Sequence, residues 1–530
     1  MVKLGSADLD RQRQTWAGQN NRLRIQSGLL ARNTLLNLLG QVLPGLVALA
    51  AIPFIIKGLG TEAFGVFSLA LVVLGYFGLF DLGLGAATTK FVAEYLGRGD
   101  TRRIAGLVWI SLGLQLVLGG TGGILLASGV SLLVGKVLNV PPALLAEART
   151  TFLLLAASLP LVLGTSALRG VLEAGQRFDL VNAVKIPALA ATYVIPGIGA
   201  SFGFRLPEIV AALVVARLAV ALAYLMLCLR AFPFLGSSIS FRFRELRPLV
   251  TYGSWIMVSN LVGPLFHYLG PLFIGILLSM TAVAYYTAPS QLLAAFWLLS
   301  GSLVPTLFPA FSSLDASSDR LAIEQLYARS LQALLLTAGP AVLIAVFLAR
   351  TILLVWLGGD FAERSTVLLQ ILLVGSLINS LALVPHTLLR GLGRPDLTAK
   401  FHLLELPIFV GTAWFLTKEM GLVGAALSWT LWVTLNAILL FGACSLLGLA
   451  PWRALVRNGL MRTGAAVLGL GMTLSLASPF TNGNLARAFL VAVILPLFAV
   501  MAWGYGLDNA GRNFLKFEIK RLRVILCPPR

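Results

Sequence analysis

Long apolar runs separated by short polar breaks follow one another along nearly the whole chain. A helix that crosses a bilayer needs about 20 mostly apolar residues, and most of these runs reach that length. The pattern predicts an all-α polytopic membrane protein with about 14 transmembrane helices. We expect these helices over residues 35–56, 63–84, 104–134, 148–168, 180–201, 208–229, 249–274, 281–307, 331–356, 366–388, 399–417, 421–446, 459–478 and 485–506.

The chain also contains an internal repeat. The segment AFGVFS at residues 63–68 resembles AVAYYT at 282–287, and Leu-Arg-Gly occurs at 168–170 and again at 389–391. Six expected helices separate the matching positions, so the two halves should be parallel six-helix bundles. The expected divisions are a basic tail (1–34), an N-terminal bundle (35–230), a linker (231–248), a C-terminal bundle (249–447), two extra helices (448–507) and a second basic tail (508–530).

Composition supports the membrane assignment, because 58% of the residues are hydrophobic, 12% are charged and the mean hydropathy is +0.90. Of the 40 Lys and Arg residues, 31 lie on the side of the N-terminus in this topology and eight on the other, with Arg217 inside a helix. Basic loops stay in the cytoplasm, so both termini are expected there. Loops that face anionic lipid then explain the net charge of +19 without nucleic acid as a partner.

Several kinds of chemistry are not indicated. The first 34 residues lack the apolar core of a signal peptide, so the first apolar run should remain as a membrane helix. Three scattered cysteines do not suggest a disulfide framework or a metal site, and no G-x-x-x-x-G-K-[ST] phosphate loop occurs. We therefore expect a transporter without a cofactor or metal, not an enzyme, in which one bundle rocks against the other.

Two stretches carry a resemblance to a known family. Residues 53–68 read PFIIKGLGTEAFGVFS, and residues 80–94 read FDLGLGAATTKFVAE. Together with AYYTAP at 284–289 and the two Leu-Arg-Gly turns, they resemble the polysaccharide-biosynthesis (Wzx-like) flippases. These flippases are a branch of the multidrug, oligosaccharidyl-lipid and polysaccharide exporter superfamily. The resemblance covers roughly residues 30–450.

The resemblance implies a flippase in the inner membrane of a bacterium. Its substrate would be an undecaprenyl-diphosphate-linked oligosaccharide, translocated for O-antigen, capsule or exopolysaccharide synthesis. Membrane lipids, a polysaccharide polymerase and other export machinery would be its partners. One departure concerns the seventh helix, where relatives often carry an Asp-Arg pair and this chain has Gly270 and Pro271. His267, one helical turn earlier, is the titratable side chain near that position.

Polar residues inside the expected helices are candidates for lining a substrate cavity. Arg217 should lie about 14 Å along the helix from Glu208, near the bilayer midplane, where facing lipid would cost at least about 2.5 kcal/mol. We expect it to face the space between the bundles, where a diphosphate would be a suitable partner. The alternative is an Arg satisfied by backbone carbonyls or a buried acid. The other candidates are Arg32, Asn37 and Gln41 in the first helix, Lys185 in the fifth, His267 in the seventh, and Glu405 with His402 in the eleventh.

Asp81 ends an apolar run and is followed by Gly83 and Gly85. It should lie about 26 Å along the helix axis from Phe64, toward the cytoplasmic edge of the bilayer. We therefore expect Asp81 and the two glycines to form a hinge and gate element within one long helix. An ion-coupling role for Asp81 is the alternative.

Other polar and aromatic residues have structural interpretations. Asp179 and Asp396 each precede an apolar run and are expected to cap the following helix. The alternative is that they pair with Arg177 and Arg394 to close the cytoplasmic mouth as a gate. Trp429 and Trp432 are expected to pack within the bundle or to anchor it at the membrane interface.

Two other functions are compatible with a chain of this class. A drug or cation antiporter of the same superfamily would need acidic residues in its cavity, whereas the deepest expected charge here is Arg217. A membrane glycosyltransferase or ligase would need a sizeable extramembrane domain, and the expected outer connections are too short for one. The flippase is therefore the favoured function.

Overall fold

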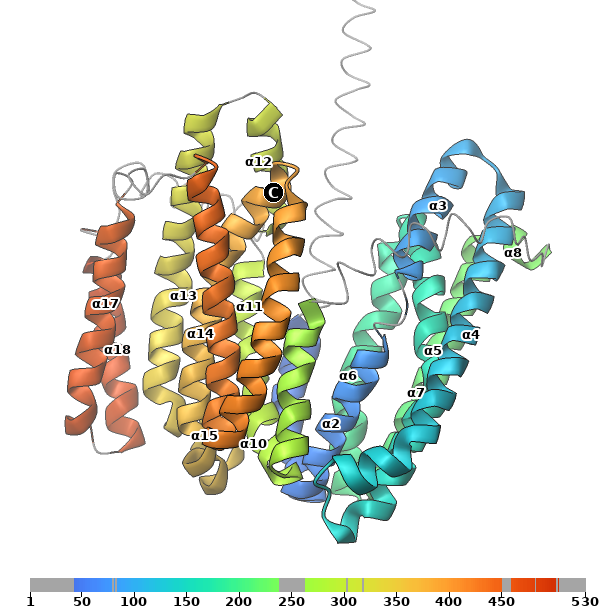
Figure 1. The fold of residues 1–530 in the computed structure, drawn as a ribbon, viewed down its shortest axis with the longest axis horizontal. Helices are drawn as coiled ribbons and strands as arrows, with labels where there is room; N and C mark the ends of the chain where they lie inside the picture. Colours follow the sequence, from blue (N-terminus) through green and yellow to red (C-terminus); the bar gives the residue numbers. More distant parts are fainter. Residues whose placement is uncertain are drawn as a thin grey trace, which may run out of the picture.

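The computed structural model describes residues 42–78, 81, 83–237, 263–301, 304–316, 319–449, 459–481, 483–501 and 504. Within these ranges the regular elements are helices, and no strand occurs. Figure 1 shows two groups of helices with a further helical pair at one side. The all-α class predicted from the apolar pattern is confirmed.

The N-terminal group, coloured blue to green in Figure 1, is called the N bundle and covers residues 42–237. Its central helix is α5, which contacts α2, α3, α4, α6 and α7. The helices are Val42–Leu59, α2 (Thr61–Gly78), α3 (Leu84–Arg98), α4 (Thr101–Leu132), α5 (Leu145–Ala174), α6 (Phe178–Ser201), α7 (Leu206–Ala231) and the short α8 (Phe234–Ser237). A π-helical turn, Leu133–Val137, follows α4, and a 3-10 turn, Pro142–Leu144, precedes α5.

The second group is called the C bundle and covers residues 263–446. Its central helix is α14, which contacts the five elements α10 to α13 and α15. The helices are Gly263–Leu277, α10 (Met280–Ser290), α11 (Leu293–Gly301), α12 (Val304–Ala316), α13 (Arg320–Leu357), α14 (Gly359–Gly391) and α15 (Pro395–Leu446). The pair α17 (Leu460–Ala477) and α18 (Asn484–Met501), joined through a 3-10 turn (Ser478–Phe480), packs on α13.

Nine helices in the described residues are long and apolar enough to cross a bilayer, and three shorter apolar helices accompany them. One of the nine, α15, has 52 residues and a non-helical residue, Gly421, with φ 61° and ψ −136°. It therefore covers two of the expected helices. Every expected range overlaps a helix, while the total of about 14 crossings stays a prediction.

The helix expected to run without interruption through Asp81 is broken. Helix α2 ends at Gly78 and α3 begins at Leu84, with Gly83 between them in a left-handed conformation (φ 70°, ψ 10°). Side chains disfavour that conformation and glycine does not. The prediction of one long helix is therefore wrong, because Gly83 starts a second helix. The expected range 281–307 is also divided, by a turn between α10 and α11 that contains no residue with positive φ.

Buried apolar side chains form one core that both bundles share at one end of the molecule. This core contains Ile52, Phe67 and Phe152 of the N bundle together with Phe273 and Tyr286 of the C bundle. At the other end each bundle has its own core: one contains Ile104 and Leu172, and the other contains Tyr327 and Leu388. In Figure 1 the ribbons meet near α2 and α10 and diverge toward α3 and α12.

Hydrogen bonds between the bundles reinforce the shared core. The backbone N–H of Asn139 donates to Gly275 O at 2.9 Å, and its Nδ2 donates to Ile276 O at 2.8 Å and Leu278 O at 3.2 Å. We call this set the Asn139 latch. Trp356 Nε1 of the C bundle donates to the carbonyl of Leu49 at 2.6 Å. These bonds join the bundles at the end where their hydrophobic core is continuous.

Helices α3 and α5 approach closely where two glycines meet. A Cβ atom added at Gly170 would lie 2.8 Å from Gly85 O and 2.9 Å from Thr89 Oγ1. Contacts this short force the backbone or the neighbouring helix to move. The crossing therefore depends on the absence of a side chain at Gly170.

We predict that Gly170→Ala lowers the free energy of unfolding by about 1–3 kcal/mol, because the added methyl group overpacks the crossing. The measurement is the thermal unfolding midpoint of the purified protein in detergent. Gly97→Ala in α3 is the matched control, since no atom lies within 4 Å of the added Cβ. Equal midpoints for the two variants would contradict the close packing of α3 on α5.

Candidate functional site

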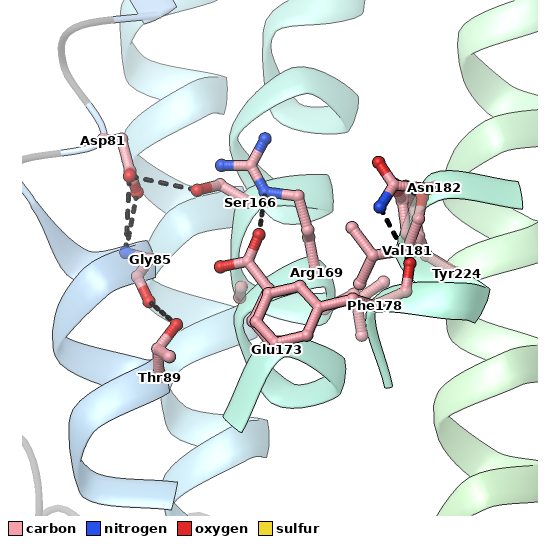
Figure 2. Close-up of polar contacts among 12 residues, drawn as sticks. Asp81, Gly85, Thr89, Ser166, Arg169, Glu173, Phe178, Val181, Asn182 and Tyr224 are labelled. Atoms are coloured by element: carbon pink, nitrogen blue, oxygen red, sulfur yellow. Dashed lines mark hydrogen bonds and ion pairs between the residues drawn. The ribbon is translucent and has the colours of Figure 1, made fainter. Parts of the chain in front are cut away.

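A carboxylate occupies the break between α2 and α3. Figure 2 shows the Asp81 side chain pointing toward Ser166 and the backbone of Gly85. Gln115 Nε2 donates to Asp81 Oδ1 at 2.6 Å, and Ser166 Oγ donates to Oδ2 at 3.1 Å. The N–H of Gly85 lies 3.3 Å from both oxygens. The carboxylate thereby ties the first turn of α3 to α4 and α5.

The polar contacts around this carboxylate continue into the buried interior. Gln115 is fully buried, and its Oε1 accepts a hydrogen bond from the N–H of Ala167 at 3.0 Å. The hydroxyls of Thr88 and Ser111, both buried, are hydrogen-bonded between α3 and α4. Buried polar groups that are fully paired hold helices in one arrangement. The hinge and gate role of Asp81, Gly83 and Gly85 stays a prediction.

The two Arg-x-Asp turns form short ion pairs. Arg177 binds Asp179 through Nε and Nη2 at 3.1 Å, and Arg394 Nε lies 3.3 Å from Asp396. The residues at the N-cap positions of α6 and α15 are the two arginines, and each aspartate lies in the first turn. The expectation that Asp179 and Asp396 are N-caps is therefore wrong, because each carboxylate pairs with the arginine two residues earlier.

Arg217 lies on the face of α7 that packs against α5. Its Nη1 donates to Ser158 Oγ at 3.0 Å, and Leu213 and Tyr224 on the same helical face are buried. Among the described ion pairs, none involves Arg217. Lys185, the second basic candidate, is a partly buried residue of α6. The structure therefore places Arg217 between two helices of the N bundle, and its role toward a substrate stays a prediction.

Glu405 is the centre of a buried polar cluster in the C bundle. It has 0% exposed surface and accepts hydrogen bonds from Trp432 Nε1 at 3.0 Å and from Asn436 Nδ2 at 2.9 Å. His402 Nδ1, one turn before it in α15, lies 3.3 Å from Oε2. Trp432 and Asn436 belong to the second half of α15, beyond the irregular Gly421. Through these hydrogen bonds, Glu405 in the first half of α15 holds the second half against it.

His267 contacts the same cluster through aromatic rings. Its ring centroid lies 4.9 Å from that of Trp297, 6.0 Å from that of Trp432 and 6.4 Å from that of Trp429. Phe266, the preceding residue, stacks on Trp432 at 4.0 Å with an interplanar angle of 12°. Two sequence candidates, His267 and Glu405, are therefore brought together by one tryptophan. Trp432 packs as expected and also donates a hydrogen bond, which was not expected.

The candidate residues thus fall into two groups, one in each bundle. The N bundle supplies Asp81 with Gly83 and Gly85, and the basic side chains Lys185 and Arg217. The C bundle supplies Glu405 and His267. Arg32, Asn37 and Gln41 lie outside the described residues. Within the described ranges, no three His, Cys, Asp or Glu side chains gather in a way that could hold a metal ion.

Four residues that complete these polar clusters were not among the sequence candidates. They are Gln115 and Ser166 beside Asp81, and Trp432 and Asn436 beside Glu405. Gln115 and Asn436 interrupt long apolar runs, which was a usable signal. An isolated amide in a membrane helix needs a partner on another helix, and an acid is a strong acceptor. The identity of that partner depends on helix packing, which the sequence does not show.

Comparison with known sequences gives a family match. A family model described as "Polysaccharide biosynthesis protein" matches residues 30–315. The chain is 27% identical over 414 residues to a protein named "Putative O-antigen transporter" from Shigella flexneri. That similarity covers 78% of this chain and 96% of the Shigella protein.

Two solved structures have a similar fold. The lipid II flippase MurJ, in an inward closed conformation, aligns with a TM-score of 0.71 and 10% identity, covering 89% of this chain and 99% of that one. A multidrug resistance MATE family transporter of the MOP superfamily, in an inward-facing conformation, aligns with a TM-score of 0.66 and 16% identity. This alignment covers 77% of this chain and 95% of the MATE transporter chain. The fold is therefore that of MOP-superfamily transporters.

We predict that Asp81→Ala lowers the free energy of unfolding by about 1–3 kcal/mol, because the buried amide of Gln115 and the hydroxyl of Ser166 lose their acceptor. Asp81→Asn should cost less, since its amide can still accept from Gln115 and donate to Ser166. Thermal unfolding in detergent measures both changes. Glu94→Gln, which removes an exposed ion pair to Arg98, is the control and should change stability by no more than about 1 kcal/mol. A larger loss for Glu94→Gln than for Asp81→Ala would contradict the assigned network.

Proposed function

The chain belongs to the polysaccharide biosynthesis protein family, and we propose on that basis that it is a flippase for a lipid-linked oligosaccharide. The substrate would be an undecaprenyl-diphosphate-linked glycan used for O-antigen, capsule or exopolysaccharide synthesis. The glycan and diphosphate would pass between the bundles while the polyprenyl tail stays in lipid. No covalent chemistry on the substrate is required for this step.

The observation that carries this proposal is the arrangement of the three hydrophobic cores. One core spans both bundles at one end, and two cores remain separate at the other. Such an arrangement fits one end state of alternating access, in which two rigid bodies are closed at one face. In the charge-based topology the separate cores lie on the cytoplasmic side, because the basic turns at Arg177 and Arg394 are there. The substrate would therefore enter from the cytoplasm.

The candidate residues have distinct proposed roles. Lys185 and Arg217 in the N bundle, together with Arg32, would supply positive charge for the diphosphate. Asn37, Gln41 and His267 would offer hydrogen-bonding groups to the glycan. Glu405, which has 0% exposed surface, would position Trp432 and Asn436. Asp81, Gly83 and Gly85 would act as the hinge and gate, a role that fits the break between α2 and α3.

The proposed location and partners follow from the proposed function. The protein would lie in the inner membrane of a bacterium with both termini in the cytoplasm. A polysaccharide polymerase would receive the translocated glycan on the far side. Other components of the export machinery would be partners rather than parts of this chain.

A flipping assay tests the proposal and the role of Arg217 together. Purified protein is reconstituted in vesicles with an undecaprenyl-diphosphate-linked glycan extracted from the source bacterium, and a membrane-impermeant glycosidase reports which leaflet the glycan occupies. We expect transfer in the wild type and its loss in Arg217→Ala. Arg205→Ala, at the exposed start of the same helix, is the matched control and should transfer normally.

Three outcomes would count against these assignments. Absence of transfer by correctly folded wild-type protein would overturn the flippase proposal. If the protein exported a cationic dye and transferred no glycan, the alternative function as a drug or cation antiporter would be supported. Normal transfer by Arg217→Ala would remove that residue from the substrate site.

The Asn139 latch provides a test of alternating access. Cysteines at positions 139 and 278, in a chain whose native cysteines are replaced by serine, can be joined by a short bifunctional maleimide. We predict that cross-linking stops glycan transfer, because the bundles must separate at this end during the cycle. Each single-cysteine variant carrying the same label is the control, and it should transfer glycan at the rate of that variant without the label. Full activity of the cross-linked protein would contradict separation at this end.

A further inference from the structure

His267 lies where the core shared by the two bundles ends. It is two helical turns before Ile274 and therefore on the same face of the helix Gly263–Leu277. Ile274 is fully buried in the shared core, whereas His267 is exposed. The next residue, Tyr268, faces the N bundle, because a Cβ atom added at Gly75 of α2 would lie 2.7 Å from the Tyr268 Oη. His267 is thus at the margin of the shared core, close to the N bundle.

Aromatic rings of the C bundle hold His267 in one orientation. The His267 ring meets those of Trp297 and Trp432 edge to face, with interplanar angles of 63° and 88°. Trp432 is itself fixed, because its Nε1 donates to Glu405 and its ring stacks on Phe266. A binding group held in place beforehand loses less conformational freedom when a ligand arrives. The cluster is therefore suited to ligand binding by its rigidity.

Trp297 carries a hydrogen-bond donor that the described residues do not use. Its Nε1 is buried and has no acceptor in the part of the chain that the structure describes. The residue as a whole is only partly buried and packs at the margin of the shared core. A buried N–H without an acceptor is costly, and native proteins rarely leave one so. A ligand oxygen beside this indole would satisfy the donor, and the exposed imidazole of His267 offers a second polar group.

The chemistry of this cluster suits a neutral ring that carries hydroxyl groups. The C–H groups on one face of a sugar ring can pack on an aromatic ring, while its hydroxyls need donors and acceptors. An organic cation also packs on aromatic faces, but an accessible acid would be needed to balance its charge. The acid of this cluster, Glu405, has 0% exposed surface and is bound by Trp432 and Asn436. The cluster therefore favours a saccharide.

We propose that Trp297 and His267 form a saccharide subsite at the margin of the shared core, in which one sugar ring of the lipid-linked glycan packs on the indole of Trp297. A hydroxyl of that sugar accepts the hydrogen bond of Trp297 Nε1, and another bonds to the imidazole of His267. No covalent bond is made or broken. The subsite rests on the proposed flippase function and adds specificity to it, because a polyprenyl diphosphate without a glycan cannot occupy the subsite.

Binding of two lipids tests the subsite without requiring transport. The purified protein in detergent is titrated with the undecaprenyl-diphosphate-linked glycan extracted from the source bacterium and, separately, with undecaprenyl diphosphate. We expect the wild type to bind the glycan-bearing lipid about tenfold more tightly, the scale of one aromatic contact and one hydrogen bond. Trp297→Leu removes the ring and the N–H, so it should abolish this difference while undecaprenyl diphosphate still binds. Trp297→Phe keeps a ring and should retain part of the difference.

Trp414→Leu, which removes a tryptophan of α15 that is 44% exposed and outside the cluster, is the matched control and should keep the difference. His267→Ala should reduce the difference and serves if Trp297→Leu fails to fold. Equal binding of the two lipids by the wild type, or a difference that persists in Trp297→Leu and His267→Ala, would overturn the subsite. So would binding of tetraphenylphosphonium that only Trp297→Leu abolishes, which would indicate a cation site. If the wild type prefers the glycan-bearing lipid but transfers none in vesicles, the flippase proposal fails while the subsite stands.

Discussion

The hydrophobic core shared by the two bundles is the interaction on which the rest of the structure depends. In a bilayer, lipid is as apolar as the side chains, so burial between helices provides little net driving force and close packing becomes decisive. The shared core contains aromatic side chains of both bundles, such as Phe67 and Phe273, and it ends where the bundles acquire separate cores. A contact confined to one end can open there without unfolding either bundle.

In each bundle a carboxylate accepts hydrogen bonds from several helical segments and holds them together; that of Asp81 is partly buried and that of Glu405 is fully buried. In the N bundle, Asp81 binds Gln115 and Ser166; in the C bundle, Glu405 binds Trp432 and Asn436. Asp81 lies in the break between α2 and α3, and Glu405 joins the two halves of α15 on either side of Gly421. The hydrogen bonds of each acid come from helices of its own bundle and do not cross to the other bundle. This division lets each bundle move as a body.

Much of this architecture was predictable from the sequence because the bilayer imposes a length and a composition on each helix. The all-α class, the family and the membrane assignment were confirmed. The break at Gly83 was missed, because a Gly-x-Gly pair in an apolar run is compatible with both a continuous and a broken helix. The partners of Asp81 and Glu405 were missed for a different reason: a hydrogen bond between distant helices depends on packing angles that no local pattern records. Arg217 shows the same limit. Its position within an apolar helix was evident from the sequence, and its contact with Ser158 was not.

The Asn139 latch determines which positions at the interface between the bundles tolerate substitution. Every bond that Asn139 makes to the C bundle ends on a main-chain carbonyl, at Gly275, Ile276 or Leu278. Such acceptors are present whatever side chain the residue carries. A change of side chain at Ile276 or Leu278 therefore leaves these acceptors in place, whereas a change at position 139 removes the two bonds that Nδ2 donates. At Gly275 an added Cβ would lie 2.8 Å from Leu69 Cδ2, so that position is constrained by packing. The latch therefore depends on one side chain, that of Asn139, whereas the rest of the closure also uses side chains of the C bundle, such as Trp356 and Phe273.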